Sequence, residues 1–463
     1  MNSLETTYVL ACLHLVLCLV AFLWTKYPII SIFHLAMATA AICFGIRPIL
    51  SATEGGYTFL RVASWSSYNR GLLYQLEFDF AYVLGYLLYF RQHRPGLRLR
   101  PHLALRIGHL ALVAVVALAT ITAIHLLSGG DWLPGHRKQA LTMLLPGGQI
   151  LFRLAVTTLS AILPLAALFF FGRRRPRTFI PAVLGLMAVF FLTLLYQRGF
   201  VLIGFLLIAW IAERYRGITY RGAVALAALL VAALMILRPL ASYIASSGET
   251  ALSSEQHPIS ESTGGVLVLK KAFLFTGNFS LAETWPVAES FVESSGRLDG
   301  ATLATIPLGL APISFRWHTG LTTIVDRLNR FYYGDAVLIT QWGFNANLAQ
   351  NLFVNFGPGL LFLGCVPGAL ISIFDRWLRE VKAMNVLTVF LAGATLASEG
   401  LVGDTAILLS YMCAYALVGS GLYLLTKVRP RSAPMGGAHS SLRPRIAIGS
   451  ATDPKSSYLR TSQ

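Results

Sequence analysis

The stretch FIPAVLGLMAVFFLTLLYQRGFVLIGFLLIAWIA, residues 179–212, decides the fold. As a single helix its 34 residues would be about 51 Å long, whereas the hydrocarbon core of a bilayer is about 30 Å thick. The basic segments RRRPR at 173–177 and ERYR at 213–216 flank the stretch, and both favour the cytoplasmic side of a membrane. The sequence therefore predicts a chain that crosses the membrane and returns, with a turn on the far side at Gln197-Arg198-Gly199.

The composition of the whole chain indicates a polytopic membrane protein. Hydrophobic residues make up 56% of the 463 residues and charged residues only 12%, against about 25% charged residues in soluble proteins. These proportions, with a mean hydropathy of +0.65, exclude a soluble globular enzyme and a disordered or fibrous chain. The five cysteines lie in apolar segments without disulfide or metal-ligand spacing. The net charge of +17 is concentrated in short loops and in the last residues, so we predict no nucleic-acid partner.

Recurring apolar segments predict an all-α fold with about eleven transmembrane helices. The predicted spans are 8–25, 27–50, 73–90, 103–127, 150–171, 179–196, 200–212, 222–240, 351–374, 386–398 and 405–426. When the loops are assigned alternately to two sides, one side carries 22 Lys and Arg against 4 Asp and Glu, and the other carries 11 against 14. This asymmetry predicts a cytoplasmic C-terminus and an N-terminus on the outer side.

The regions between and after the spans complete the predicted organisation. Residues 1–426 form a single transmembrane domain, with a large outer loop at 241–350 inserted before the last three spans. Apolar stretches at 266–275 and 301–315 predict short interfacial or re-entrant helices in this loop rather than a separate soluble domain. Residues 427–463, rich in Pro, Ser, Arg and Gly, predict a disordered basic cytoplasmic tail.

Arginine dominates the ionisable residues at the predicted outer border of the membrane, where charged side chains are costly and are candidates for function. A guanidinium binds phosphate through two parallel hydrogen bonds, so these arginines suit a lipid-linked phosphate or diphosphate. Snorkelling to the interface, or pairing with a carboxylate, is the structural alternative for each, and it is favoured for Arg47, Arg153 and Arg238. Arg198 is the leading candidate, because its short turn offers few partners. The predicted phosphate-binding residues are Arg198, Arg238, Arg316, Arg327 and Arg330.

The outer loop contains a second candidate cluster, Arg316-Trp317-His318. It combines a phosphate binder, a flat ring on which a sugar can stack, and an imidazole suited to general base catalysis near neutral pH. We predict Trp317 as a glycan-binding residue and His318 as a catalytic residue. A surface loop with an interfacial tryptophan is the open alternative.

Two carboxylates near the outer start of the third span, Glu77 and Asp79, raise the question of a divalent cation. Metal-dependent lipid-phosphate sugar transferases use acidic outer loops in this way. Residues two apart on a helix point about 200° from each other, so these carboxylates would not share a ligand. We favour a structural role for both and predict neither a metal nor another cofactor.

Two stretches carry a resemblance to a known family. Tyr196-Gln197-Arg198-Gly199-Phe200 resembles a Ser/Lys-Arg-Gly turn between two mid-chain spans, and the stretch 343–359, GFNANLAQNLFVNFGPG, resembles a Gly-rich entry to a span that ends in Asn-Phe-Gly. Together with the predicted architecture, they resemble the bacterial O-antigen polymerase family, the lipid-linked oligosaccharide repeat-unit polymerases. This chain departs from the family where an acidic residue often precedes Asn-Phe-Gly, because it has Gln350 and Asn351 there.

The resemblance implies a reaction at the periplasmic face of the bacterial inner membrane. In that family a growing polysaccharide on undecaprenyl diphosphate is transferred to an incoming lipid-linked repeat unit, and undecaprenyl diphosphate leaves without the help of a metal. The implied partners are undecaprenyl-diphosphate-linked oligosaccharide, membrane lipid and a chain-length regulator of the pathway. Arg198 and His318 would then be catalytic, and Asn355 would join the substrate-binding residues. Two alternatives stay open: an O-antigen ligase or polyprenyl-phosphate-sugar-dependent transferase, and a flippase or transporter of the lipid-linked oligosaccharide.

Overall fold

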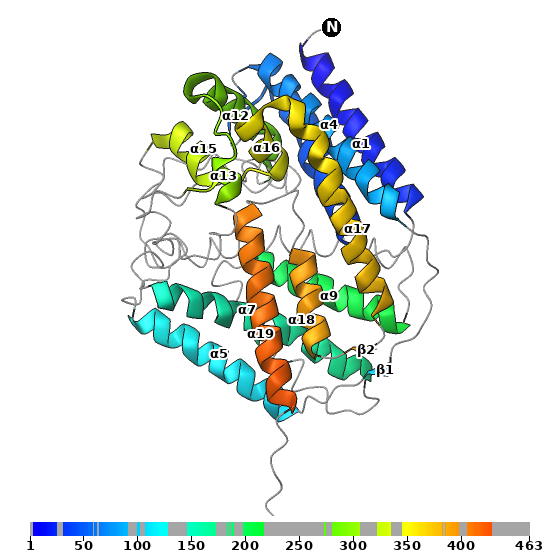
Figure 1. Ribbon diagram of the computed structural model, residues 1–463, viewed down its shortest axis with the longest axis vertical. Helices are drawn as coiled ribbons and strands as arrows, with labels where there is room; N and C mark the ends of the chain where they lie inside the picture. Colours follow the sequence, from blue (N-terminus) through cyan, green and yellow to red (C-terminus); the bar gives the residue numbers. More distant parts are fainter. Residues whose placement is uncertain are drawn as a thin grey trace, which may run out of the picture. The chain divides into compact units, whose positions relative to one another are not determined.

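A computed structural model of the chain shows a helical protein (Figure 1). The structure describes residues 3–25, 31–90 without 59 and 63, 100–101, 107–127, 146–172, 183, 185, 187–188, 198–216, 273–274, 280–305, 322–334, 345–381, 383–384, 386–397 and 405–427. The helices of this part of the chain are accompanied by two short strands, β1 (Arg100–Pro101) and β2 (Ala383–Met384), which pair in parallel.

Four helical stretches in the described residues are long and apolar enough to cross a membrane. The first is α1 (Ser3–Trp24), and the second runs without interruption from Ile32 to Thr53 through α2 (Ile32–Ala40), the π-helical turn η1 (Ala41–Ile46) and α3 (Arg47–Thr53). The third, Ile150–Leu168, lies within α7 (Pro146–Gly172). The fourth, Pro358–Glu380, joins the 3₁₀ helix η6 (Pro358–Gly364) to α17 (Cys365–Glu380). These helices are consistent with a multi-pass membrane protein, and the number of eleven spans stays a prediction.

Seven further helices coincide, wholly or in part, with predicted spans or with the predicted outer loop before the last three spans. Four of them overlap predicted spans: α4 (Trp65–Tyr89), α5 (Ile107–Leu127), α18 (Val386–Ala397) and α19 (Thr405–Lys427). Within the predicted outer loop the structure describes α12 (Leu281–Ser295), α13 (Ala301–Ala304) and α15 (Ile324–Tyr333). The predicted span 222–240 and all but four residues of 179–196 lie outside the described residues, as does the tail beyond Lys427.

Two predicted boundaries near the deciding stretch and the Asn-Phe-Gly triplet are wrong. Arg198 and Gly199, expected in a connecting turn, are the first residues of α9 (Arg198–Arg216). The expected span 351–374 is broken, because α16 (Leu348–Phe356) ends before Gly357 and a new helical stretch begins at Pro358. Gly357 has a φ of +82°, which favours glycine, and the proline that follows it cannot donate the hydrogen bond that would continue α16.

Glycines allow the backbones of α4 and α17 to approach closely, and the two helices run side by side in Figure 1. A Cβ atom added to Gly85 of α4 would lie 2.0 Å from the carbonyl oxygen of Cys365, and one added to Gly368 of α17 would lie 2.1 Å from that of Tyr82. Gly364 and Gly368 are four residues apart, the spacing that lets two helix backbones approach in a membrane.

Segments that the charge pattern assigns to the cytoplasmic side contact one another. The strand pair joins residues 100–101 to 383–384, and Arg214 donates from Nη2 to the carbonyl oxygen of Val381 at 2.7 Å. Asp375 accepts hydrogen bonds from the backbone N–H groups of Ile32 and Phe33, at 2.8 and 3.2 Å, and so caps the start of α2. The corresponding segments on the predicted outer side also meet, as the next subsection describes.

Candidate functional site

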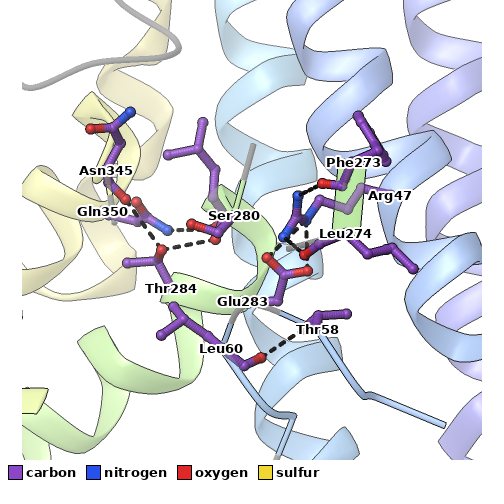
Figure 2. A network of polar contacts seen from close by, with 11 residues as sticks. Arg47, Thr58, Leu60, Phe273, Leu274, Ser280, Glu283, Thr284, Asn345 and Gln350 are labelled. Atoms are coloured by element: carbon purple, nitrogen blue, oxygen red, sulfur yellow. Dashed lines mark hydrogen bonds and ion pairs between the residues drawn. The ribbon is translucent and has the colours of Figure 1, made fainter. Parts of the chain in front are cut away.

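Arg47, the first residue of α3, anchors the start of α12 through a fully buried ion pair (Figure 2). Its Nε lies 2.7 and 3.0 Å from the two carboxylate oxygens of Glu283, and its Nη1 and Nη2 donate to the carbonyl oxygens of Phe273 and Leu274, each at 2.7 Å. The side chains of Arg47 and Glu283 are 0% and 1% exposed. The structure thus gives Arg47 the carboxylate partner that was its favoured alternative.

The electrostatics of this pair indicate a structural role. Burial raises the pKa of Glu283 above its ordinary value, and the charge and hydrogen bonds of Arg47 offset part of that increase. Removing either partner would leave a charged group buried without compensation. The pair therefore fixes α12 against α3, and its burial leaves no room for a substrate group.

The start of α16 is held by a second set of buried polar contacts. Asn347 and Gln350 form a reciprocal cap: each side chain accepts a hydrogen bond from the backbone N–H of the other. Gln350 also donates from Nε2 to the carbonyl oxygen of Leu281 at 2.7 Å, and Asn347 donates from Nδ2 to Oε1 of Gln75 at 2.9 Å. Gln350 thus connects α16 to α12 (Figure 2). It lies in the region where the O-antigen polymerase family often has an acidic residue.

Asn355 of the Asn-Phe-Gly triplet is fully buried and uses both atoms of its amide within the protein. Its Nδ2 donates to Oγ1 of Thr302 at 2.5 Å and to Oδ1 of Asn351 at 2.9 Å, and its Oδ1 accepts from the N–H of Thr302 at 3.4 Å. These contacts dock α13 onto α16. The predicted role of Asn355 in substrate binding stays a prediction.

Helix α15 presents two of the predicted arginines beside exposed aromatic rings. Ile324 and Leu328 are buried, whereas Phe331 and Tyr332 are 40% and 45% exposed. Arg327 and Arg330 lie three residues apart, so they share one side of the helix. The guanidinium of Arg327 donates from Nε to Oγ1 of Thr322 at 2.9 Å, and within the described residues neither arginine forms an ion pair. Of the predicted site residues, this pair is the one whose arrangement suits a phosphate ligand.

The other predicted site residues are not brought together in the described part of the chain. Arg238, Arg316, Trp317 and His318 lie outside the described residues, and Arg198 is described only as the backbone start of α9. Glu77 is exposed while Asp79 is fully buried, as expected for opposite faces of α4. Within the described residues there is no group of three His, Cys, Asp or Glu side chains placed to hold a metal ion.

Several residues that make the buried contacts are absent from the predicted site residues. Glu283, Gln75 and His14 are not among the residues that the sequence pattern singles out. The signal was their position: each is a polar residue within an otherwise apolar helical pattern, and such residues are buried only with partners.

Comparisons with protein-family models, with curated proteins and with solved structures find no match to this chain.

Proposed function

We propose that the protein is a metal-independent glycosyltransferase that polymerises undecaprenyl-diphosphate-linked oligosaccharide repeat units at the periplasmic face of the bacterial inner membrane. The growing glycan passes to the incoming unit and undecaprenyl diphosphate is released. The observation that carries the proposal is on α15, where Arg327 and Arg330 lie side by side without a carboxylate partner in the described residues. Such a pair matches the charge of a diphosphate, and the exposed Phe331 and Tyr332 suit the interface where the lipid lies.

The contacts between loops support one outer face for this site. The N-terminal residues meet the start of α4, where Asn69 donates from Nδ2 to the carbonyl oxygen of Ser3 at 2.6 Å. The start of α4 in turn meets α12 through Glu289, which accepts from Ser67 and pairs with Arg70 at 2.7 Å. The alternating assignment of the loops places all these segments on the outer side.

The chemistry needs little beyond electrostatics and one base. Diphosphate is already a good leaving group, so the site has to hold its increasing negative charge and to deprotonate one sugar hydroxyl. In the proposal, Arg198, Arg238, Arg316, Arg327 and Arg330 hold the charge, Trp317 and Asn355 bind the glycan, and His318 is the base. No step in this scheme requires a metal.

The test measures the length of the glycan chains made by a strain in which the gene is deleted. The wild-type protein or a variant is expressed in this strain from a plasmid. We expect the empty strain to cap its lipid with single repeat units, and the wild-type protein to restore long chains. The double variant Arg327→Ala/Arg330→Ala should be inserted normally and should shorten or abolish the long chains. Arg376→Ala is the matched control: Arg376 is an exposed arginine paired with Glu380 on a segment with cytoplasmic charge balance, and its loss should change nothing.

The same strains separate the alternatives. Loss of every cap in the empty strain would contradict a polymerase and favour a ligase or flippase. Normal polymer from the double variant would contradict the assignment of α15. In a purified system, abolition of activity by EDTA with rescue by magnesium or manganese would favour a metal-dependent transferase.

A further inference from the structure

A histidine and an aspartate face each other in the buried contact between α1 and α4. Nδ1 of His14 lies 3.3 Å from Oδ2 of Asp79, and both side chains are 0% exposed. Neither of these two atoms forms a hydrogen bond within the described residues. Both residues lie well inside their helices, His14 in α1 and Asp79 in α4. A buried pair of this kind is a candidate for function in a membrane protein.

Backbone groups determine where the protons lie on one side of this contact. Gln350 donates to a carbonyl oxygen, that of Leu281, and accepts from a backbone N–H, that of Asn347, so the orientation of its amide is fixed. Asn347 accepts from the N–H of Gln350, so its Nδ2 is the atom that donates to Oε1 of Gln75. Gln75 must then donate from Nε2 to Oδ1 of Asp79, at 2.8 Å. Oδ1 of Asp79 is therefore an acceptor, and any proton on this carboxyl group is on Oδ2.

The carbonyl group of Leu72 determines the tautomer on the other side. Nε2 of His14 lies 3.1 Å from this carbonyl oxygen, which can only accept, so Nε2 carries the hydrogen. In a neutral imidazole, Nδ1 is then a bare lone pair, and it faces Oδ2 of Asp79. Without one more proton, two lone pairs would face each other in a buried site, which is unfavourable.

We propose that His14 and Asp79 share one proton between Nδ1 and Oδ2, and that this buried proton-binding site holds α1 against α4. The shared proton makes the pair neutral in either form, as imidazolium with carboxylate or as imidazole with carboxylic acid. Its loss leaves one uncompensated negative charge in the interior. The site is separate from the proposed glycan transfer, and it holds whether or not that proposal is correct.

The surroundings of the pair contain no competing charge in the described residues. On α1 the thiol of Cys18 is within reach of the charge of Asp79, and on η1 the ring of Phe44 lies 5.6 Å from the ring of His14. The neighbouring carboxylate on α4, Glu77, is exposed on the opposite face, and among the described residues Asp79 has no Lys or Arg partner. Among the described residues, a proton is therefore the positive charge that can compensate Asp79.

The first test reads the two protonation states directly, in protein reconstituted in lipid nanodiscs. ¹⁵N NMR of labelled histidine reports the protonation of the His14 ring, and the signal is assigned by its loss in His14→Gln. The infrared carbonyl band of a carboxylic acid reports a protonated Asp79, and it is assigned by its loss in Asp79→Asn. We expect Nε2 to be protonated, together with either an imidazolium and a carboxylate or a neutral ring and a carboxylic acid. A neutral ring beside an ionised Asp79 would overturn the proposal, as would a ring protonated on Nδ1 alone.

The second test uses the pH dependence of unfolding. If the folded protein binds one proton more at this pair than the unfolded chain does, the thermal midpoint of the wild type falls as the pH rises, and we expect a fall of at least about 3 °C between about pH 6 and pH 9. In Asp79→Asn the new amide can accept from Gln75 and donate to Nδ1 of His14 without an extra proton, so its midpoint should change much less. Glu77→Gln, the matched control on the exposed face, should behave as the wild type does. An equal pH dependence in Asp79→Asn and the wild type would overturn the proposal.

Discussion

At the scale of single residues, burial separates the charged groups that support the fold from those that remain accessible to a ligand. Arg47 has a carboxylate and two carbonyl oxygens around its guanidinium, whereas Arg327 makes a single hydrogen bond to a hydroxyl group. The sequence predicts both arginines on the outer side of the membrane, with a structural role favoured for Arg47 and phosphate binding predicted for Arg327. The difference lies in the partners that folding brings to each.

The first prediction concerns the buried ion pair. Glu283→Ala should lower the free energy of unfolding by about 3–5 kcal/mol, because it leaves the guanidinium of Arg47 buried without a counter-charge. Arg47→Lys should also destabilise the protein, because an ammonium cannot contact both the carboxylate and the two carbonyl oxygens in the same geometry. Unfolding in mild detergent by a chemical denaturant measures both effects.

The control for this pair is Arg376→Ala, which removes an ion pair with Glu380 whose side chains are 48% and 49% exposed. An exposed pair of this kind contributes about 0.5 kcal/mol or less. If Glu283→Ala and Arg376→Ala destabilise the protein equally, the buried pair does not anchor α12.

The second prediction concerns Arg198 at the start of α9. Arg198→Ala should lower the rate of glycan polymerisation about 100-fold, corresponding to about 3 kcal/mol, because a charge-assisted contact to the leaving diphosphate is lost. Arg198→Lys should retain partial activity, since it keeps the charge but loses the paired hydrogen bonds. Polymer length and amount, normalised to the protein in the membrane, measure the effect. If Arg198→Ala is inserted normally and makes polymer of normal length and amount, Arg198 does not contact the diphosphate and only anchors the helix at the interface.

At the scale of the elements, short breaks within apolar stretches position the polar groups. The π-helical turn η1 lies between α2 and α3, directly before Arg47, and Gly357 separates α16 from the apolar stretch that begins at Pro358. A π-helical turn shifts the register of the residues that follow it, and such turns are frequent at functional positions. Each break lets one part of an apolar stretch pack in the bundle while the other part carries polar contacts.

The third prediction tests the close approach of α4 and α17. Gly368→Ala should destabilise the protein by about 1–3 kcal/mol, because the added methyl group would lie 2.1 Å from the carbonyl oxygen of Tyr82 and would push the helices apart. Gly421→Ala in α19 is the control, since its added methyl group meets nothing within 4 Å. That change should be neutral or stabilising by up to about 1 kcal/mol, because alanine favours the helix. Equal thermal midpoints for the two variants would contradict a tight α4–α17 contact.

At the scale of the whole molecule, the two-sided distribution of charge is the strongest organising feature. The cytoplasmic side was predicted from 22 basic against 4 acidic residues, and the segments on that side that the structure describes contact one another. The capping of α2 by Asp375 joins two more segments with the same assignment. Segments that the charge pattern predicts on one side are thus in contact, and the orientation of the chain in a membrane stays a prediction.

The fourth prediction is the orientation. A reporter that is active only outside the cytoplasm should be active when fused near residue 290, in α12, and silent when fused near residue 435, because basic loops are retained in the cytoplasm. A cytoplasmic reporter should give the complementary pattern at the same two positions. The reverse pattern would contradict the orientation and the periplasmic site built on it.

The sequence by itself predicted a helical chain with long apolar segments, and the structure has four helical stretches that are long and apolar enough to cross a membrane. These follow from local quantities, because an apolar segment of sufficient length must form a helix in a bilayer, and flanking charge sets its direction. It also determined that Glu77 and Asp79 point to opposite faces, which follows from helical periodicity alone. The boundaries at Arg198 and Gly357 were less well determined, since helix ends depend on caps and on packing.

Only the tertiary structure decided which polar residues are buried together. Glu283 lies 236 positions after Arg47, Asn347 lies 272 positions after Gln75, and Asp375 lies 343 positions after Ile32, so no local pattern relates them. Each of these contacts exists because a polar group removed from water requires a partner, and folding supplies that partner from a distant helix. The shared proton of His14 and Asp79 is of the same kind, because it follows from the directions of hydrogen bonds that begin at backbone groups on α12 and α4.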